Sequence, residues 1–212
     1  MESAAPVAFL FFSVNSPGLL PLLFLTHYLN RAFISPLRTP SRSKSHLVVP
    51  LAAILFNLIN AYLLASFFND RSRPPRPPAQ FYVGILLWFI GFAGNIWHDE
   101  VLLNLRRSAA NSNSNLYAIP NGGLYALISF PNYFCEWLEW FGFALASSPV
   151  PLSFSLAPPP QGWAPDLTPP WIFFFNEILL MLPRAYRGHQ WYKQRFGDSY
   201  PKDRKAIIPF IL

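Results

Sequence analysis

The chain is poor in charged residues and has a single cysteine. Only 12% of its 212 residues are charged, whereas soluble domains carry about 25%. One cysteine excludes an intrachain disulfide framework. Hydrophobic residues make up 52% of the chain, including 21 Phe and 7 Trp. The low charge and the abundance of large apolar side chains together indicate a membrane protein.

The net charge of +6 raises the possibility of a nucleic-acid partner. The basic residues lie between hydrophobic runs, however, and form no continuous basic face of the kind that follows a phosphate backbone. We therefore expect no nucleic-acid binding.

Five apolar stretches approach the roughly 20 residues that a helix needs to cross a bilayer. A further apolar segment, residues 6–14, is too short to cross alone. No internal repeat is visible, so we expect one membrane-embedded domain over residues 1–212, an all-α polytopic integral membrane bundle of five to six membrane helices. The five stretches are residues 18–33, 47–68, 81–105, 124–146 and 171–192.

Basic residues are distributed unevenly between these stretches. Of the 16 Lys and Arg residues, three (Arg71, Arg73 and Arg76) follow the second stretch, and the other 13 lie near the ends of the first, third and fifth stretches or after them. Since cytoplasmic loops are enriched in Lys and Arg, the bias predicts a cytosolic C-terminus and a cytosolic loop at residues 106–123.

The third stretch ends in the polar sequence GNIWHDEVLLNLRR, residues 94–107. At 100° per residue, Asn95, Asp99 and Arg106 fall within about 60° on one helix face. A plain interfacial cap would account for Glu100 and for the arginine after Arg106. It does not account for Asn95, which lies a turn deeper in the apolar stretch. A polar residue at such a depth indicates a candidate functional site.

A metal site is not expected in this stretch. His98, Asp99 and Glu100 are consecutive, so they point in three directions from a helix and cannot bind one ion together. The HExxH spacing of helical zinc sites is absent as well. His98 and Glu100 therefore receive no ligand role.

A second polar strip occurs in PNYFCEWLEWFGFALA, residues 131–146. Asn132, Glu136 and Glu139 have the spacing i, i+4, i+7 and share a helix face. Two carboxylates on a buried face are costly without partners. Pairing with arginines of other helices and binding of a ligand are both compatible with this spacing.

Two further clusters lie at the cytosolic ends of the first and last stretches. A lone Tyr or Trp at such a boundary is usually a membrane anchor, but four polar clusters at one side of a bundle suit a dinucleotide. Arginines hold phosphates, and aromatic rings stack on bases. IPNGGLY, residues 119–125, lacks the phosphate-loop and Rossmann glycine patterns. The two clusters comprise His27, Tyr28 and Arg31, and Arg184, Arg187, His189, Trp191 and Tyr192.

Taken in order, these motifs resemble the steroid 5α-reductase family (3-oxo-5α-steroid 4-dehydrogenases). The resemblance covers almost all of the chain beyond residue 25. It rests on HYxxR (27–31), GNxxxDxxLxxLR (94–106), YxIPxGGL (117–124), SxPNYxxExxEWxGxALA (129–146), RAxxxHxWY (from 184) and YPxxRKAxIPF (from 200).

The resemblance implies a polytopic enzyme of the endoplasmic reticulum membrane that reduces a conjugated enone with NADPH. Cofactor would enter from the cytosol, and a lipid-like substrate would lie between helices. Asn95, Asp99 and Arg106 would line the adenosine-phosphate side of the cofactor, with Arg31 near the phosphates. The full expected cofactor set is Arg31, Asn95, Asp99, Arg106, Tyr117, Asn132, Glu136, Arg184, His189 and Tyr192.

The resemblance also implies two catalytic residues, Tyr28 and Glu2. Tyr28 matches the family tyrosine that hydrogen-bonds the substrate carbonyl, and Glu2 matches its glutamate partner. A glutamic acid in an apolar pocket stays neutral because burial disfavours its charged form. Hydrogen bonds from both groups would draw electrons from the alkene of a 3-oxo-Δ4 steroid, so that its β-carbon accepts hydride.

The chain departs from the family pattern in several places. The membrane helix that normally precedes the catalytic glutamate is not present before Met1, Cys135 replaces a glycine, and Ala118 replaces a basic residue. Alternatives therefore stay open. They are a polyprenal or enoyl-CoA reductase of the same family, a truncated inactive member, and an isoprenylcysteine-type membrane methyltransferase.

Overall fold

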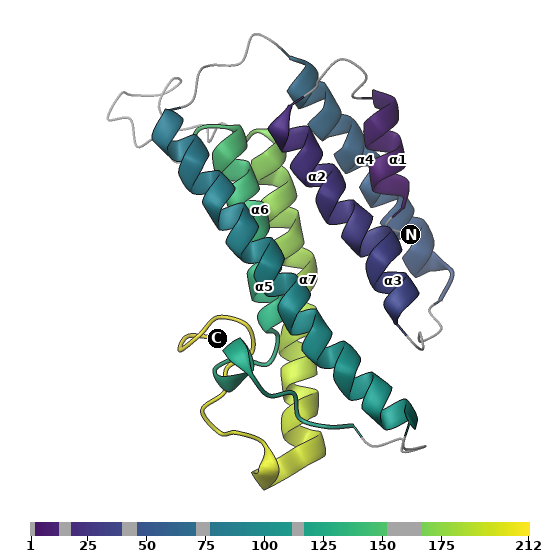
Figure 1. Cartoon of the computed structure of the whole chain (residues 1–212), viewed down its shortest axis with the longest axis vertical. Coiled ribbons are helices and arrows are strands. Elements are labelled where there is room, and N and C mark those ends of the chain that lie inside the picture. The colour runs from purple at the N-terminus through teal and green to yellow at the C-terminus, as the bar shows by residue number, and fades with distance from the viewer. Residues whose placement is uncertain (1–2, 13–17, 40–45, 71–76, 112–116, 152–166) are drawn as a thin grey trace. The chain divides into compact units, whose positions relative to one another are not determined.

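The computed structural model describes residues 3–12, 18–39, 46–70, 77–111, 117–151 and 167–212 (Figure 1). Every regular element among these residues is a helix, which confirms the all-α prediction. The elements are α1 (Ala4–Phe12), α2 (Leu19–Leu29), the π-helix η1 (Asn30–Ile34), α3 (Ser35–Arg38), α4 (Val48–Asn69), α5 (Pro78–Asn111), the 3-10 helix η2 (Gly123–Ala126), α6 (Pro131–Ser147), α7 (Pro169–Phe196) and η3 (Gly197–Ser199).

Two of the helices are long and apolar enough to cross a membrane. They are α4 (Val48–Asn69), with a mean hydropathy of 2.0, and Pro78–Ala109 within α5, with a mean hydropathy of 1.5. In the most apolar 18-residue stretch of each helix, only 28% (α4) and 22% (α5) of the stretch is buried. Both helices therefore expose long apolar faces. Large exposed apolar surfaces mark contact with lipid or with another protein, which supports a membrane protein.

The stretch predicted to span from residue 124 to 146 begins later in the structure. Residues 123–126 form the turn η2, and α6 starts only at Pro131. Proline favours the first turn of a helix, where its missing N–H costs no hydrogen bond. Residues 127–130 instead donate and accept backbone hydrogen bonds with the C-terminal segment. The prediction was therefore wrong at this boundary, because an unbroken apolar run does not reveal the turn.

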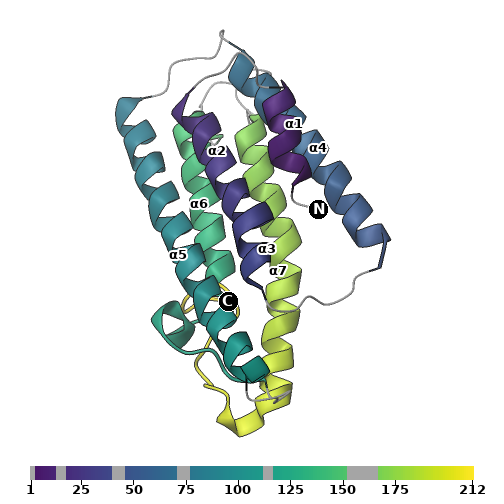
Figure 2. The ribbon, with the colours of Figure 1, turned by 45° about the vertical axis from the view of Figure 1, so that its right-hand side comes forward.

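The described residues form two compact units. The first comprises Met1–Ile85 and Phe143–Phe173, and the second comprises Leu86–Gly142 and Phe174–Leu212. In the first unit α1 packs along α4 (Figure 2), and Asn69 Nδ2 donates a hydrogen bond of 2.9 Å to the Phe12 carbonyl at the end of α1.

Aromatic rings make up much of the core of the first unit. The Phe9 and Phe24 ring centroids are 4.6 Å apart, and Phe68 meets Phe143 edge-on at 5.9 Å. Phe24 also lies 6.4 Å from Phe173. Tilted and edge-to-face pairs of this kind add stabilisation beyond the area that they bury. They join α1, α2, α4, the C-terminal end of α6 and the start of α7.

Two glycines of α5 set the packing of the second unit. A Cβ at Gly91 would overlap the backbone nitrogen of Glu139, and a Cβ at Gly94 would lie 2.7 Å from Cys135 Sγ. Because neither glycine carries a side chain, α5 and α6 approach closely at this level. The polar strips of the two helices are thereby brought face to face.

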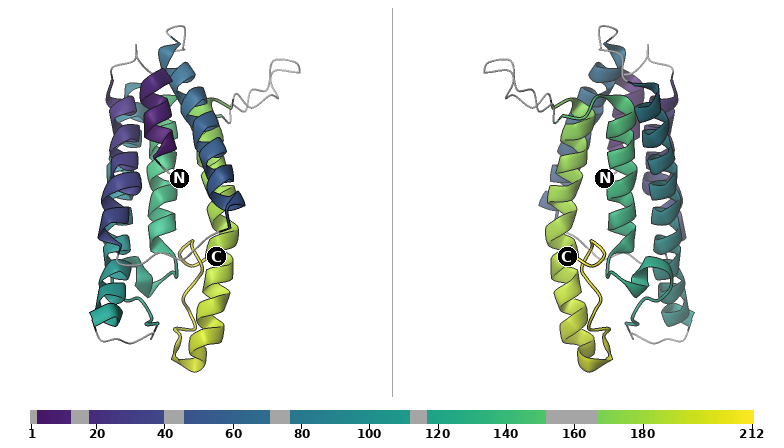
Figure 3. Two further views of the ribbon diagram at one scale, coloured as in Figure 1. Left: turned by 90° about the vertical axis from the view of Figure 1, so that its right-hand side faces the viewer. Right: turned by 90° about the vertical axis from the view of Figure 1, so that its left-hand side faces the viewer.

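The C-terminal segment returns beside the end of α7 (Figure 3). The Lys205 N–H donates to the Leu127 carbonyl over 2.8 Å, and the Ser129 N–H donates to the Lys205 carbonyl over 2.8 Å. Ile207 is fully buried in a cluster with Trp137, Met181 and Ala185. The segment is therefore an integral part of the second unit.

Candidate functional site

The two polar strips predicted on α5 and α6 meet in the second unit. Asn95 Nδ2 donates to the Asn132 carbonyl (3.2 Å) and to Glu136 Oε2 (3.0 Å). Asn132 Nδ2 in turn donates to Asp99 Oδ1 over 2.9 Å. Asn95, Asn132 and Glu136 are all buried. Charge-assisted hydrogen bonds from amides to carboxylates offset part of the cost of burying the acids.

One acceptor in this network is left without a protein donor. Asn132 Oδ1 is buried and has no hydrogen-bond partner among the described residues. Buried polar atoms in native proteins are nearly always satisfied. A ligand that presents an N–H or O–H, such as a carboxamide or a ribose hydroxyl, would complete the Asn132 side chain.

The α5 strip becomes more exposed toward its C-terminal end. Asn95 is buried, Asp99 is half-buried and Arg106 is exposed. The charged ends of this strip act on the hydroxyl of Tyr125, which lies in η2, outside the long helices. Burial raises the pKa of Tyr125 and the Asp99 charge raises it further, whereas Arg204 and Arg106 oppose the shift. Asp99, Arg106 and Arg204 therefore lie close enough to Tyr125 for their charges to act on its hydroxyl.

His98, to which sequence reasoning gave no role, forms a hydrogen bond with the backbone of the turn η2. Its Nδ1 lies 2.6 Å from the Gly94 carbonyl oxygen, and the Leu124 N–H donates to its Nε2 over 3.1 Å. Since Nε2 accepts, Nδ1 carries the proton and donates to the carbonyl. Gly123 has φ +53, and a Cβ there would lie 2.8 Å from His98 Nε2. His98 is thus a buried structural anchor.

Cys135 fits into the same contact. Its thiol is buried, faces Gly94 and lies 3.8 Å from His98 Nδ1. The bulk that replaces the family glycine is therefore accommodated at the α5–α6 contact. Among the described residues, no group of three or more His, Cys, Asp or Glu side chains could hold a metal ion.

Arg204 is a second residue that sequence reasoning left without a role. It is only 3% exposed, donates to the Pro120 carbonyl over 3.2 Å and to Asn121 Oδ1 over 3.4 Å, and lies 5.1 Å from the Tyr200 ring centroid. Its only sequence signal was its place in the RKAxIPF motif. The buried guanidinium ties the C-terminal segment to the loop that precedes η2.

His189 and Tyr192 occupy the last turns of α7. The Ser129 hydroxyl lies 2.6 Å from His189 Nδ1 and 2.6 Å from the Tyr200 hydroxyl. The Tyr192 ring stacks on Tyr200 at 5.6 Å with an interplanar angle of 12°. Both predicted cofactor residues therefore help to dock the C-terminal segment.

Tyr117 and Arg184 lie at the surface of the second unit. Tyr117 is 67% exposed, and its ring meets Trp191 edge-on at 5.1 Å. Arg184 on α7 is exposed as well. The structure does not join these two side chains to the Asn95–Asn132 network through any contact among the described residues.

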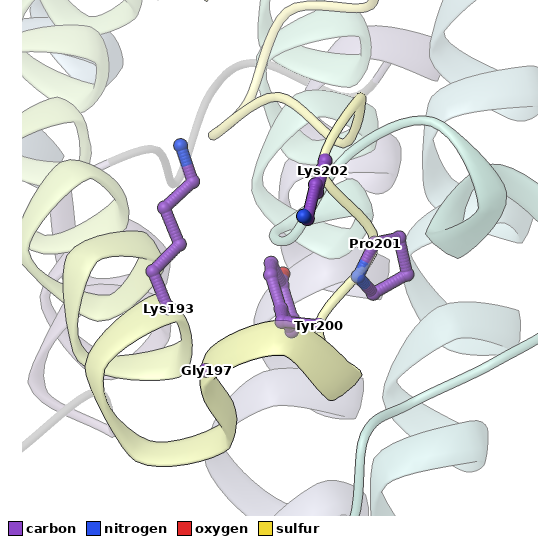
Figure 4. A pocket seen from close by; sticks show the side chains of 5 residues that line it. All are labelled: Lys193, Gly197, Tyr200, Pro201 and Lys202. Carbon is purple, nitrogen blue, oxygen red and sulfur yellow. The ribbon is translucent and has the colours of Figure 1, made fainter.

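A shallow cavity of about 290 Å³ opens at the end of α7 (Figure 4). Lys202 beside it pairs with Asp198 at 3.4 Å, and both side chains are highly exposed. None of the predicted cofactor residues lines this cavity. It is lined by Lys193, Gly197, Tyr200, Pro201 and Lys202.

The predicted catalytic tyrosine lies in the first unit. Tyr28 on α2 is buried, packs against Phe24 at 4.7 Å and donates its hydroxyl proton to Asn57 Oδ1 over 3.3 Å. Arg31 follows in the π-helix η1 and is half-buried. Short π-helices are frequent at functional sites. Glu2 lies outside the described residues.

Comparison with known proteins identifies the family. The sequence model described as 3-oxo-5-alpha-steroid 4-dehydrogenase matches residues 43–156 and 164–212. An uncharacterized protein of Schizosaccharomyces pombe is 41% identical over 90% of this chain and 66% of its own length. A steroid 5-alpha-reductase of Solanum lycopersicum is 35% identical over 97% of this chain and 70% of its own length.

A further relative is the 3-oxo-5-alpha-steroid 4-dehydrogenase 1 of Bos taurus, 36% identical over 90% of this chain and 66% of its own length. The chain thus spans about two thirds of the length of the relatives that it matches. The resemblance of its motifs and the match of the family model agree. The chain belongs to the 3-oxo-5-alpha-steroid 4-dehydrogenase (steroid 5α-reductase) family of oxidoreductases.

Proposed function

We propose that this protein reduces the C4–C5 double bond of a 3-oxo-Δ4 steroid, or of a similar enone lipid, with NADPH as the hydride donor. Family membership supports the reaction type. The observation that carries the cofactor assignment is the buried network of Asn95, Asn132 and Glu136, in which Asn132 Oδ1 has no hydrogen-bond partner among the described residues.

The residues of the second unit have the chemistry that a dinucleotide needs. Asn132 offers a buried acceptor to a carboxamide or hydroxyl donor. Asp99 is half-buried and offers a carboxylate. Arg106 is exposed and presents a guanidinium, which suits phosphate oxygens. When NADPH is bound, it supplies the hydride that the β-carbon of the enone accepts.

The chain's own part in the chemistry is to polarise the enone. Tyr28 donates a hydrogen bond to the substrate carbonyl, and protonated Glu2 donates a second one. Two donors stabilise the negative charge that develops on this oxygen, which is the role of an oxyanion hole. The enolate then takes a proton from solvent at the α-carbon, so that one hydride and one proton saturate the double bond. Apolar surroundings, such as Phe24 beside Tyr28, exclude water and strengthen these hydrogen bonds.

We further infer a topology of five to six membrane helices in the endoplasmic reticulum membrane, with the C-terminus and the cofactor on the cytosolic side. The two apolar helices α4 and α5 support membrane insertion. The excess of Lys and Arg after the first, third and fifth apolar stretches supports the orientation. The lipid-like substrate would reach the enzyme from the bilayer.

The test is turnover by the protein purified in detergent. NADPH oxidation is followed by absorbance with a 3-oxo-Δ4 steroid, with a polyprenal and with an enoyl-CoA as separate substrates. We expect reduction of the steroid, dependent on NADPH. Preference for polyprenal or enoyl-CoA would reassign the substrate within the family. Absence of turnover with all three, or tight binding of S-adenosylmethionine in place of NADPH, would contradict the proposal.

A further inference from the structure

The hydroxyl of Tyr28 meets the side-chain amide of Asn57 inside the first unit. The two residues belong to α2 and α4, and the hydroxyl donates to Asn57 Oδ1 over 3.3 Å. Both side chains are buried, with exposures of 5% and 6%. The contact therefore lies in the interior of the unit and away from solvent.

An asparagine is costly at this point of the chain. Asn57 lies in the middle of α4 (Val48–Asn69), which has the higher mean hydropathy of the two candidate membrane helices. In hydrocarbon a polar side chain must find a partner within the protein, and such residues mark functional sites. The partner of Asn57 is the same hydroxyl that the proposed reaction uses to polarise the enone carbonyl.

We propose that Asn57 is a positioning residue for Tyr28, an inference that rests on the proposed function. In the enzyme without substrate, Asn57 Oδ1 accepts the tyrosine proton and fixes the direction of the hydroxyl. When the substrate oxygen arrives, Tyr28 donates to it instead. A half-turn of the terminal amide about its broad, roughly two-fold torsion then lets Asn57 Nδ2 donate to the phenolic oxygen.

This second hydrogen bond strengthens Tyr28 as a donor. Hydrogen bonds in a chain polarise one another, so an N–H donated to the phenolic oxygen makes its O–H a better donor to the carbonyl. An apolar residue at position 57 offers neither the acceptor before substrate binding nor the donor afterwards. An apolar residue at position 57 is therefore expected to lower turnover. This loss should occur only when the Tyr28 hydroxyl is present.

The same helix supplies a matched control. Asn60 lies three residues after Asn57, hence on the same face of α4, and is 5% exposed. Its Nδ2 has no hydrogen-bond partner among the residues that the structure describes. Asn60 thus shares residue type, helix and burial with Asn57, but the hydrogen bond from Tyr28 goes to Asn57.

The experiment compares wild type with Asn57→Leu, Tyr28→Phe, the double variant Asn57→Leu/Tyr28→Phe, Asn60→Leu and Asn60→Leu/Tyr28→Phe, all in detergent. We expect Asn57→Leu to lower kcat about tenfold, as misplacement of a catalytic group does. NADPH affinity should stay within about twofold of wild type, because the proposal gives Asn57 no contact with the cofactor. In the Tyr28→Phe background, Asn57→Leu should have no further effect. Asn60→Leu should have the same effect in both backgrounds.

The thermal unfolding temperatures of the same variants test the contact separately from the reaction. The shifts caused by Asn57→Leu and Tyr28→Phe should be non-additive, since each removes the same hydrogen bond. Additive shifts would overturn the inference, as would equal losses of kcat from Asn57→Leu in both backgrounds. If wild type reduced no enone, the proposed function and the positioning role of Asn57 would both fail, while non-additive shifts would still establish the Tyr28–Asn57 contact.

Discussion

Asn132 Nδ2 donates a 2.9 Å hydrogen bond to Asp99 Oδ1, and this bond joins α6 to the half-buried carboxylate of α5. The same Asn132 accepts from Asn95 through its backbone carbonyl. Asn132 therefore stands at the centre of the network, and its buried Oδ1 has no hydrogen-bond partner among the described residues.

Replacement of Asn132 by alanine is expected to weaken NADPH binding about tenfold to a hundredfold, because one ligand contact and the orientation of Asp99 are both lost. Isothermal titration of detergent-solubilised protein measures the effect. Asn104→Ala is the control, since Asn104 is exposed on α5 and accepts a hydrogen bond from its neighbour Arg107 over 3.0 Å. Equal loss in both variants would remove Asn132 from the cofactor site.

The neighbouring arginines 106 and 107 are expected to behave differently. Arg107 donates to Glu100 over 2.9 Å, and exposed pairs of this kind contribute little to stability. Arg106 is exposed and belongs to the strip of Asn95 and Asp99. Arg106→Leu should lower NADPH affinity about tenfold, whereas Arg107→Leu should leave it nearly unchanged. Isothermal titration of each variant with NADPH measures the two affinities. A larger loss of affinity in Arg107→Leu than in Arg106→Leu would contradict the assignment of Arg106 to the cofactor site.

Gly91→Ala is expected to force α5 and α6 apart. Its Cβ would meet the Glu139 backbone, which cannot move as a flexible side chain does. Overpacking of this kind costs about 1–3 kcal/mol, so the thermal unfolding temperature should fall together with NADPH affinity. Gly18→Ala serves as control, because its Cβ would make only an ordinary contact of 3.7 Å with Pro21. An unchanged unfolding temperature for Gly91→Ala would exclude the close helix approach.

His98→Leu is expected to release the turn η2 without unfolding the helices. The Leu124 N–H would lose its acceptor and the Gly94 carbonyl its donor. Hydrogen exchange measured by mass spectrometry should then show faster exchange for peptides that cover residues 120–127, with little change in α7. Protection equal to wild type in these peptides would show that His98 does not anchor the turn.

Helical periodicity was sufficient to predict which residues share the polar faces of α5 and α6. Asn95 and Asp99 lie on one such face, Asn132 and Glu136 on the other, and each face follows from spacing alone. Spacing within a helix does not predict which residues meet across two helices, because that depends on the close approach at Gly91 and Gly94.

Other features escaped sequence reasoning because they depend on contacts distant along the chain. His98 binds the backbone of Leu124, so no side-chain pattern reports the contact. Arg204 reaches Pro120 only because the C-terminal segment folds back beside residues 127–130. Asn57 stood inside an apolar run, and its contact with Tyr28 depends on how α2 and α4 pack.

The expectation of five to six membrane crossings and of one domain over residues 1–212 stays a prediction. Hydropathy alone identified α4 and the apolar part of α5, which are long and uninterrupted. It misplaced the boundary at residue 124, where apolar side chains continue through a turn. Apolar composition reports burial in protein or lipid but does not distinguish a helix from a buried turn.

The expected role of Tyr28 separates catalysis from cofactor binding. Tyr28→Phe removes the hydroxyl that donates to Asn57 and keeps the ring that packs on Phe24. Turnover with a 3-oxo-Δ4 steroid should fall about a hundredfold or more, as expected for loss of a hydrogen-bond donor to the developing oxyanion, at unchanged NADPH affinity. Steady-state kinetics and NADPH titration of the same preparation check both. Equal losses of turnover and affinity would contradict the assignment.

The most direct test of the central claim is isotope transfer. Purified wild-type protein is incubated with a 3-oxo-Δ4 steroid and NADPH that carries deuterium at the transferable position, and the product is analysed by mass spectrometry. The account predicts a steroid reduced at C4–C5 with the deuterium on the β-carbon. Unreduced steroid, or a reduced product without the label, would contradict it.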